Sequence, residues 1–315
     1  MSRRIFSFGL LAACALLLLL PPIAFAGSTV IFSTGFEQSE GYIAGFPLDG
    51  QRGWVANGTG GNGVLSGVNQ QVFLGYNAPL SDSETSTTVW KPLNYGSVHS
   101  NSILKFYVEI AVIDSSPGVI DRDEFRWSVY NTNDNRLFSL IFDNGSLEIF
   151  SFLSDGTTYD TGISFKNGVS YTLVILMDFA QNRWNASLNG SDLKINSPIS
   201  VNTQVPLTFG DVDAVWFYTD PANPGDNYML FDNYRVSLES ATRPTLQSIS
   251  ATNRQFRLRL FGENGVGYAV EASSTLASNR WVAIATNIVS SGSFDLVDPM
   301  QPPPSQRFYR GRWVP

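Results

Sequence analysis

The sequence contains almost no cysteine or histidine, and this absence removes several classes of functional site. Among 315 residues there are one cysteine, Cys14, and one histidine, His99. A single histidine excludes metal sites built from several histidines and disfavours a Ser-His-Asp hydrolase triad. A chain cleaved after Ala26 would also have no cysteine, which excludes disulfides and cysteine metal sites. Stability would then depend on the size of the core and on any bound cation.

The first 26 residues have the features of an export signal. Arg3 and Arg4 precede a leucine-rich apolar stretch, and Ala24-Phe25-Ala26 has the small-x-small pattern of a cleavage site. A retained membrane anchor is disfavoured because Pro21-Pro22 interrupts the stretch. We therefore expect a signal peptide over residues 1–26, a mature chain without a membrane span, and a secreted or cell-surface location. The export route stays open.

Charge is distributed unevenly along the chain. Residues 27–242 carry 23 acidic and 10 basic side chains, whereas residues 243–315 carry 8 arginines, no lysine and 4 acidic side chains. This shift predicts a boundary near residue 240, with a linker over 239–244. A strongly acidic first unit does not suit nucleic acid as a partner.

No part of residues 27–315 has a convincing helical period. Short runs that alternate apolar and polar residues predominate, such as Ser102–Ile113 and Glu124–Tyr130. Turn signals such as Asn144-Gly145 and Asn189-Gly190 separate these runs, and their residues tolerate the positive φ of tight hairpins. Many short strands with this spacing predict an all-β protein, built as an antiparallel sandwich.

Two stretches resemble known families. The order of strands from Asn131–Phe142 to the tryptophan strand of Arg183–Gly190 (RWNASLNG) resembles the concanavalin A-like lectin and laminin-G-like jelly rolls. The resemblance implies a jelly-roll domain over residues 27–238. Residues 245–315, which include Gly267–Ser273 and Arg307–Arg310, resemble a small C-terminal β-sandwich module found in secreted bacterial proteins. About 70 residues can form such a module but hardly an enzyme.

A carboxylate near the end of the first unit is unexpected. If Tyr228–Leu238 (YMLFDNYRVSL) is extended, Asp232 shares a face with apolar residues, and burying an uncompensated charge is costly. Together with Ser33–Glu37 (STGFE) and Trp54, this run is similar to carbohydrate-binding jelly rolls whose first and last strands pair and hold a structural calcium. The resemblance implies that Glu37 and Asp232 are calcium ligands. The alternative is that Asp232 accepts backbone hydrogen bonds at a bulge.

The most acidic cluster precedes a predicted strand. Asp121–Glu124 leads into Phe125–Tyr130, and alternation places Glu124, Arg126 and Tyr130 on one face of that strand. These three side chains are candidates for polar contacts with a sugar, although a solvated loop is the plainer interpretation. Related lectin-like glucanases carry two glutamates flanking an aspartate on one strand, and only Glu124 is present here. No catalytic residue is therefore assigned.

Three aromatic residues are candidate stacking platforms for sugar rings: Trp90, Trp216 and Tyr218. Core packing is the alternative for each. The sequence thus favours a secreted, non-catalytic protein that binds an extracellular polysaccharide or a cell-surface glycan. A polysaccharide-active hydrolase or lyase on the same fold, and a structural surface or matrix protein, remain alternatives, and neither the glycan nor the oligomeric state is specified.

Overall fold

The structure is a computed structural model that describes residues 27–98, 102–240, 244–252, 255–262, 267–276, 280–289, 291–298 and 306–314. The predicted signal peptide (1–26) and residues 241–243 of the predicted linker lie outside these ranges. Within them, no helix is long and apolar enough to cross a membrane.

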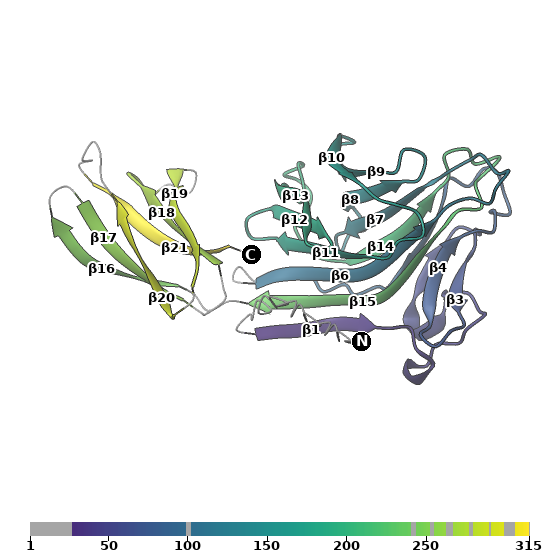
Figure 1. Ribbon diagram of the computed structural model, residues 1–315, viewed down its shortest axis with the longest axis horizontal. Coiled ribbons are helices and arrows are strands. Elements are labelled where there is room, and N and C mark those ends of the chain that lie inside the picture. Colours follow the sequence, from purple (N-terminus) through teal and green to yellow (C-terminus); the bar gives the residue numbers. More distant parts are fainter. Residues whose placement is uncertain are drawn as a thin grey trace, which may run out of the picture.

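Two stacked antiparallel sheets form the larger unit (Figure 1). The eight-stranded sheet has the order β13-β12-β11-β6-β15-β4-β3, with β1 paired to β15, and the seven-stranded sheet has the order β10-β9-β8-β7-β14-β5-β2. The first comprises β1 (Gly27–Thr34), β3 (Asn62–Leu65), β4 (Gln71–Gly75), β6 (Ser102–Ile113), β11 (Tyr171–Asp178), β12 (Arg183–Leu188), β13 (Ser191–Ser197) and β15 (Tyr228–Ser240). The second comprises β2 (Val55–Asn57), β5 (Ser86–Trp90), β7 (Glu124–Tyr130), β8 (Arg136–Asp143), β9 (Glu148–Leu153), β10 (Thr158–Ser164) and β14 (Asp211–Phe217). Two short 3₁₀ helices, η1 (Gln38–Glu40) and η2 (Gln51–Gly53), lie between β1 and β2.

Aromatic side chains join the two sheets. Trp127 on β7 lies with its ring centroid 5.2 Å from that of Phe106 on β6 and 5.3 Å from that of Phe231 on β15. All three side chains are almost completely buried, as the alternation of apolar residues along their strands predicts. The antiparallel jelly-roll sandwich predicted from the sequence is confirmed.

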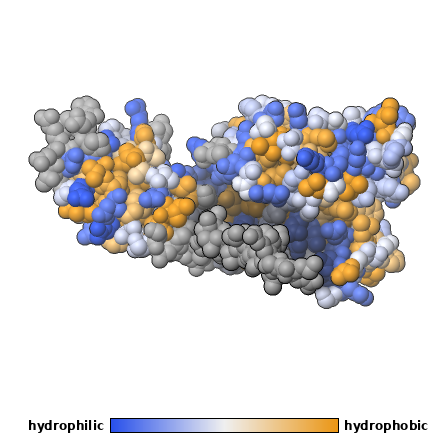
Figure 2. Space-filling model, in the orientation of Figure 1, coloured by the Kyte–Doolittle hydropathy of each residue, from blue (hydrophilic) through white to orange (hydrophobic). Residues whose placement is uncertain are grey.

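A second hydrophobic core lies among the last six strands, whose sheets are β16-β17-β20 and β19-β18-β21. These strands are β16 (Thr245–Thr252), β17 (Gln255–Phe261), β18 (Gly267–Ser273), β19 (Val282–Ile288), β20 (Ser293–Asp298) and β21 (Phe308–Val314). The core includes Leu260, Tyr268 and Val270, each fully buried. This is the predicted small β-sandwich. On the visible surface of the protein, apolar and polar residues are interspersed (Figure 2).

Strand β15 departs from the predicted alternation. Asn233 has φ +53°, and the register between β15 and β6 shifts between Asp232 and Arg235. This bulge lets Phe231 and Tyr234 both point into the core, while Asp232 lies opposite Glu109 on the other face of the sheet. The expectation that Asp232 shares the apolar face is therefore wrong, because an extra residue breaks the period of two.

Candidate functional site

Strand β7 presents the three predicted polar residues to the outer face of the seven-stranded sheet. Glu124, Arg126 and Tyr130 are half-buried, whereas Phe125 and Trp127 between them are fully buried in the core. The alternation read from the sequence is confirmed here. Arg126 forms an ion pair with Glu124, with 2.5 Å between Nη2 and Oε2, so these two side chains are arranged as one unit.

Phenylalanine rings and arginines cover the same face beside β7. The Arg126 guanidinium lies 3.9 Å from the ring centroid of Phe217 on β14 and 5.8 Å from that of Phe152 on β9. The Arg136 guanidinium lies 3.9 Å from the Phe152 centroid. Such stacking orients the planar groups and holds them in place. We call this surface the aromatic face; it consists of Arg126, Arg136, Phe150, Phe152 and Phe217, all half-buried.

A hydroxyl pair forms the floor beneath the arginines. Ser128 on β7 and Ser139 on β8 lie 2.7 Å apart between their Oγ atoms and are almost completely buried, although both point away from the core. The side chains of the aromatic face cover them. The face is therefore a packed layer with partly exposed rings rather than a deep pocket.

Two aspartates of β14 also point outward, which the sequence analysis did not anticipate. Val212 and Ala214 of this strand are in the core, and Asp211 and Asp213 lie on the opposite side. Burial raises the pKa of Asp213 well above its ordinary value, and the charges of Asp211 and Asp134 raise it further. Burial likewise raises the pKa of Asp211 to about 6. These shifts favour the protonated forms, and a hydrogen bond links the two carboxyl groups.

This pairing decides what the two carboxyl groups can do. Glycosidases keep their carboxyl pair about 5–5.5 Å apart for retention and about 6.5–9.5 Å apart for inversion. Two carboxyl groups that share a hydrogen bond are closer than either spacing allows. The Oδ1 atom of Asp213 is buried and has no hydrogen-bond partner, so it is not presented to a substrate. The arrangement is that of a buried carboxyl pair joined by a hydrogen bond.

The predicted stacking residues divide between the surface and the core. Trp90 is half-buried and outward-facing at the end of β5, beside the fully buried Val89. Trp216 and Tyr218 are 0% and 1% exposed. The indole N–H of Trp216 donates to Asp123 Oδ2 at 3.0 Å, and the Tyr218 hydroxyl is hydrogen-bonded to Thr87. Their assignment as stacking platforms is corrected: both belong to the core, and only Trp90 remains available.

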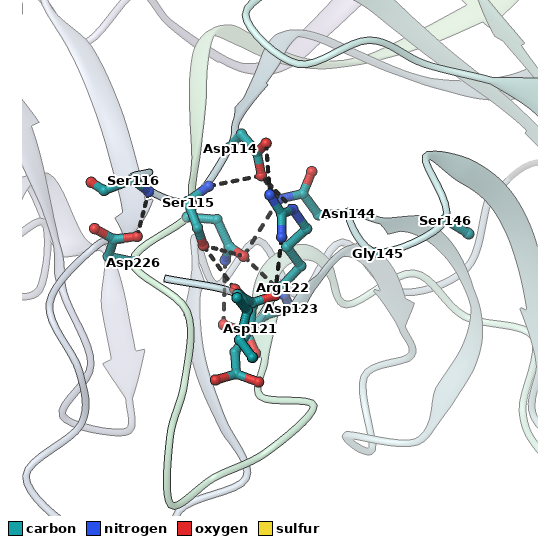
Figure 3. Close-up of polar contacts among 12 residues, drawn as sticks. Asp114, Ser115, Ser116, Asp121, Arg122, Asp123, Asn144, Gly145, Ser146 and Asp226 are labelled. Atoms are coloured by element: carbon teal, nitrogen blue, oxygen red, sulfur yellow. Dashed lines mark hydrogen bonds and ion pairs between the residues drawn. The ribbon is translucent and has the colours of Figure 1, made fainter. Parts of the chain in front are cut away.

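The acidic cluster before β7 is a structural element rather than a solvated loop. Asp123 is fully buried and accepts hydrogen bonds from the Trp216 indole and from the backbone N–H groups of Thr219 (3.0 Å) and Gly225 (2.9 Å). Burial raises its pKa, and these donors oppose the shift. Asn227 accepts from the Asp123 N–H at 2.9 Å. Figure 3 shows how Asp123, Asn144 and Asp114 gather from separate loops at one end of the sandwich.

The residues proposed as calcium ligands come together around Gly35, on the eight-stranded sheet. A Cβ atom at Gly35 would lie 3.7 Å from Glu37 Cγ and from Asn233 Oδ1, and 3.9 Å from Asp232 Oδ1. Burial, together with the nearby charges of Glu109, Glu37 and Glu40, raises the pKa of Asp232 to about 6. Among the described residues, no group of three acidic, histidine or cysteine side chains is arranged to hold a metal. Two carboxylates and one amide oxygen nevertheless converge here, and these are hard ligands of the type that calcium takes.

Comparisons with known proteins concern the fold. No protein-family model matches the sequence, and no curated protein matches it. Peanut lectin is 10% identical, with a TM-score of 0.46, over 69% of this chain and 100% of the lectin. An endo-1,3-beta-glucanase from Streptomyces sioyaensis is 12% identical, with a TM-score of 0.48, over 68% of this chain and 98% of the glucanase. A sialidase is 9% identical, with a TM-score of 0.42; the match covers 64% of this chain and 17% of the sialidase. The similarity concerns the path of the backbone, and no functional residue of these proteins is assigned to this chain.

Proposed function

We propose that the protein binds glycans through the aromatic face without catalysing their breakdown. The observation that carries the proposal is the stacking of Arg126 and Arg136 on half-buried phenylalanine rings. Partly exposed, orientationally fixed rings offer flat apolar surfaces to the C–H face of a sugar, and guanidinium groups donate several hydrogen bonds to hydroxyls. Trp90 on the neighbouring strand β5 and Tyr130 on β7 would extend this surface.

The state of the carboxyl groups favours binding over glycoside hydrolysis. Asp211 and Asp213 are bonded to each other, and Glu124 is paired with Arg126. Neither arrangement leaves two carboxyl groups at the separation that a glycosidase needs. The extracellular setting of the proposal rests on the leader-like residues 1–26, and its partner would be an extracellular polysaccharide or a cell-surface glycan.

We also propose a structural calcium ion held by Glu37 and Asp232. Support comes from the convergence of both side chains with Asn233 around Gly35, next to the pairing of the first and last strands of the unit. A cation there would compensate several nearby carboxylates. Since Glu37 and Asp232 belong to segments at opposite ends of the unit, it would also link those ends without a disulfide.

A retention screen tests the glycan proposal. The purified protein is passed over immobilised polysaccharides, and both retention and released sugar are scored. We expect retention without release, and we expect Phe152→Ala to weaken binding at least about fivefold. Leu80→Ala, at a position 88% exposed and away from the sheet, serves as the control and should bind like the parent. Sustained release of product, or equal retention of the parent and Phe152→Ala, would contradict the proposal.

A further inference from the structure

A hollow lies away from the aromatic face, beside the β3–β4 edge of the eight-stranded sheet. Its volume is about 650 Å³, within the range of small-molecule sites. One wall is formed by Ile43 and Ala44, which follow η1, and the other by Ser66 and Gly67 in the turn from β3 to β4. Figure 2 shows hydrophobic residues among hydrophilic ones at the end of the molecule where β3 and β4 lie.

The wall that contains Ile43 and Ala44 is held in place, although the Ile43 side chain is exposed. Ile43 is 60% exposed, whereas the preceding Tyr42 is buried. The side chain of Gln51 accepts a hydrogen bond from the Ile43 N–H at 2.7 Å and donates to the Pro47 carbonyl at 2.7 Å. These contacts fix the loop with an apolar side chain directed outward, so the wall is formed before any ligand binds.

The acidic side chains nearby are engaged in hydrogen bonds within the protein. Glu40 accepts hydrogen bonds from the Thr34 hydroxyl at 2.8 Å and from two backbone N–H groups, and Glu37 accepts from the backbone N–H of Gln70 at 3.4 Å. Among the described residues, no charged side chain lines the hollow. In a unit with such an excess of acidic residues, an uncharged lining selects for a neutral ligand.

Polar groups of the lining are suited to hydroxyls. Gln38 and Gln70 contribute amides, and Ser66 contributes a hydroxyl. Gln70 is 8% exposed, and its Oε1 atom has no hydrogen-bond partner. The Gln70 side chain therefore forms the buried floor of the hollow, whereas the exposed Gln38 amide and Ser66 hydroxyl are open to the hydroxyl groups of a ligand. Amides on one side and the aliphatic Ile43 and Ala44 on the other match the polar edge and apolar face of a sugar ring.

From this combination we infer that the hollow is a second binding site, independent of the aromatic face, for a neutral saccharide unit. Gln38 and Ser66 bind its hydroxyl groups above the buried Gln70, and Ile43 packs against its C–H face. Because Glu37 accepts from the backbone of Gln70, the floor of this site is tied to the segment that also carries the proposed calcium ligand.

Amide NMR spectra of the purified protein test the inference. Methyl glycosides of glucose, galactose and mannose are added separately up to about 50 mM, because single sugars bind shallow sites in the millimolar range. We expect at least one sugar to shift the side-chain amide signals of Gln38 and Gln70 saturably. Gln38→Ala should weaken that binding about two- to tenfold. Ser66→Trp, which fills the hollow from an exposed position, should abolish it.

The same NMR spectra provide a control variant and the results that would contradict the inference. Gln204→Ala removes an equally exposed glutamine elsewhere and should leave binding unchanged. The inference fails if none of the three sugars moves the Gln38 and Gln70 signals, or if Gln38→Ala and Ser66→Trp bind like the parent. The Arg126 Nε–H signal reports binding at the aromatic face. If a sugar shifts only this signal, the proposed function is supported and the site in the hollow is contradicted. If a sugar shifts only the signals of the hollow, the second site is supported and the aromatic face is contradicted.

Discussion

Asp211 and Asp213 project from the same face of β14, where burial, the charge of Asp211 and a hydrogen bond between the two carboxyl groups raise the pKa of Asp213. A carboxyl group whose folded-state pKa is raised stabilises the fold while it is protonated. Its contribution is lost as pH rises through the folded pKa.

The first prediction concerns pH. The free energy of unfolding should fall as pH rises from about 4 to 8, because Asp211, whose pKa is raised to about 6 in the folded protein, loses there a proton that the unfolded chain has already released. At pH 8, Asp213→Asn should stabilise the protein by about 1 kcal/mol or more, since it removes a buried ionisable group. Urea denaturation at each pH measures the free energy of unfolding of both proteins. Asp82→Asn, at an exposed position, should have no such effect, and a parent whose stability rises steadily to pH 8 would refute the assignment.

The second prediction concerns calcium. A chelator should lower the melting temperature of the parent protein by several degrees, because removal of a cation leaves Asp232 among other carboxylates. Asp232→Ala should melt at one temperature with and without chelator. Differential scanning fluorimetry provides the comparison, with Asp82→Ala as a control that should keep the response of the parent. An identical melting temperature for the parent in both conditions would count against the site.

The third prediction separates surface from core tryptophans. Trp90→Ala should weaken glycan retention with little loss of stability, because Trp90 is half-buried at the end of β5. Trp216→Ala should cost about 3–5 kcal/mol of unfolding free energy, because the ring is completely buried. Denaturant titration and the retention assay are applied to both variants. Equal destabilisation by the two substitutions would contradict the placement of Trp90.

The fourth prediction concerns the loops at the end of the sandwich. Asp123→Ala leaves the Trp216 indole and the Thr219 and Gly225 N–H groups without their acceptor, and should destabilise the protein by about 2–5 kcal/mol. Asp121→Ala removes a half-buried neighbour and should change stability by less than about 0.5 kcal/mol. Thermal unfolding distinguishes them. Similar melting temperatures for the two variants would show that Asp123 does not hold the loops.

The sequence predicted what depends on local periodicity. The alternation of Glu124–Tyr130 follows from a pattern within a few residues, whereas the pairing of the first and last strands of the larger unit was implied only by the resemblance to carbohydrate-binding jelly rolls. The prediction of the face on which Asp232 lies was wrong because of a single backbone conformation: the positive φ of Asn233 moves Asp232 to the other face. Asparagine tolerates that conformation, but nothing in the residues of β15 makes it compulsory.

Contacts between segments far apart in the sequence account for other differences between the sequence-based expectations and the structure. Trp216 shares the core face of β14 with Val212 and Ala214, and its N–H donates to Asp123, 93 residues earlier; neither Trp216 nor Asp123 alone indicates the other. The spacing of Asp211 and Asp213 does indicate two carboxyl groups on one face of a strand. Both residues belong to the first half of β14, which begins at Asp211.

The pairing of β1 with β15 also determines how the larger unit responds to its attachments. Gly27 lies opposite Ser240, so the chain enters and leaves the unit at the same point. Consider a pulling force applied to the chain before Gly27 and to the module after Ser240. This force would break the β1–β15 hydrogen bonds one after another from that end, instead of loading all of them at once in shear. The same adjacency means that a short connection from Ser240 back to Gly27 would give a circularly permuted unit with its new termini in any exposed turn.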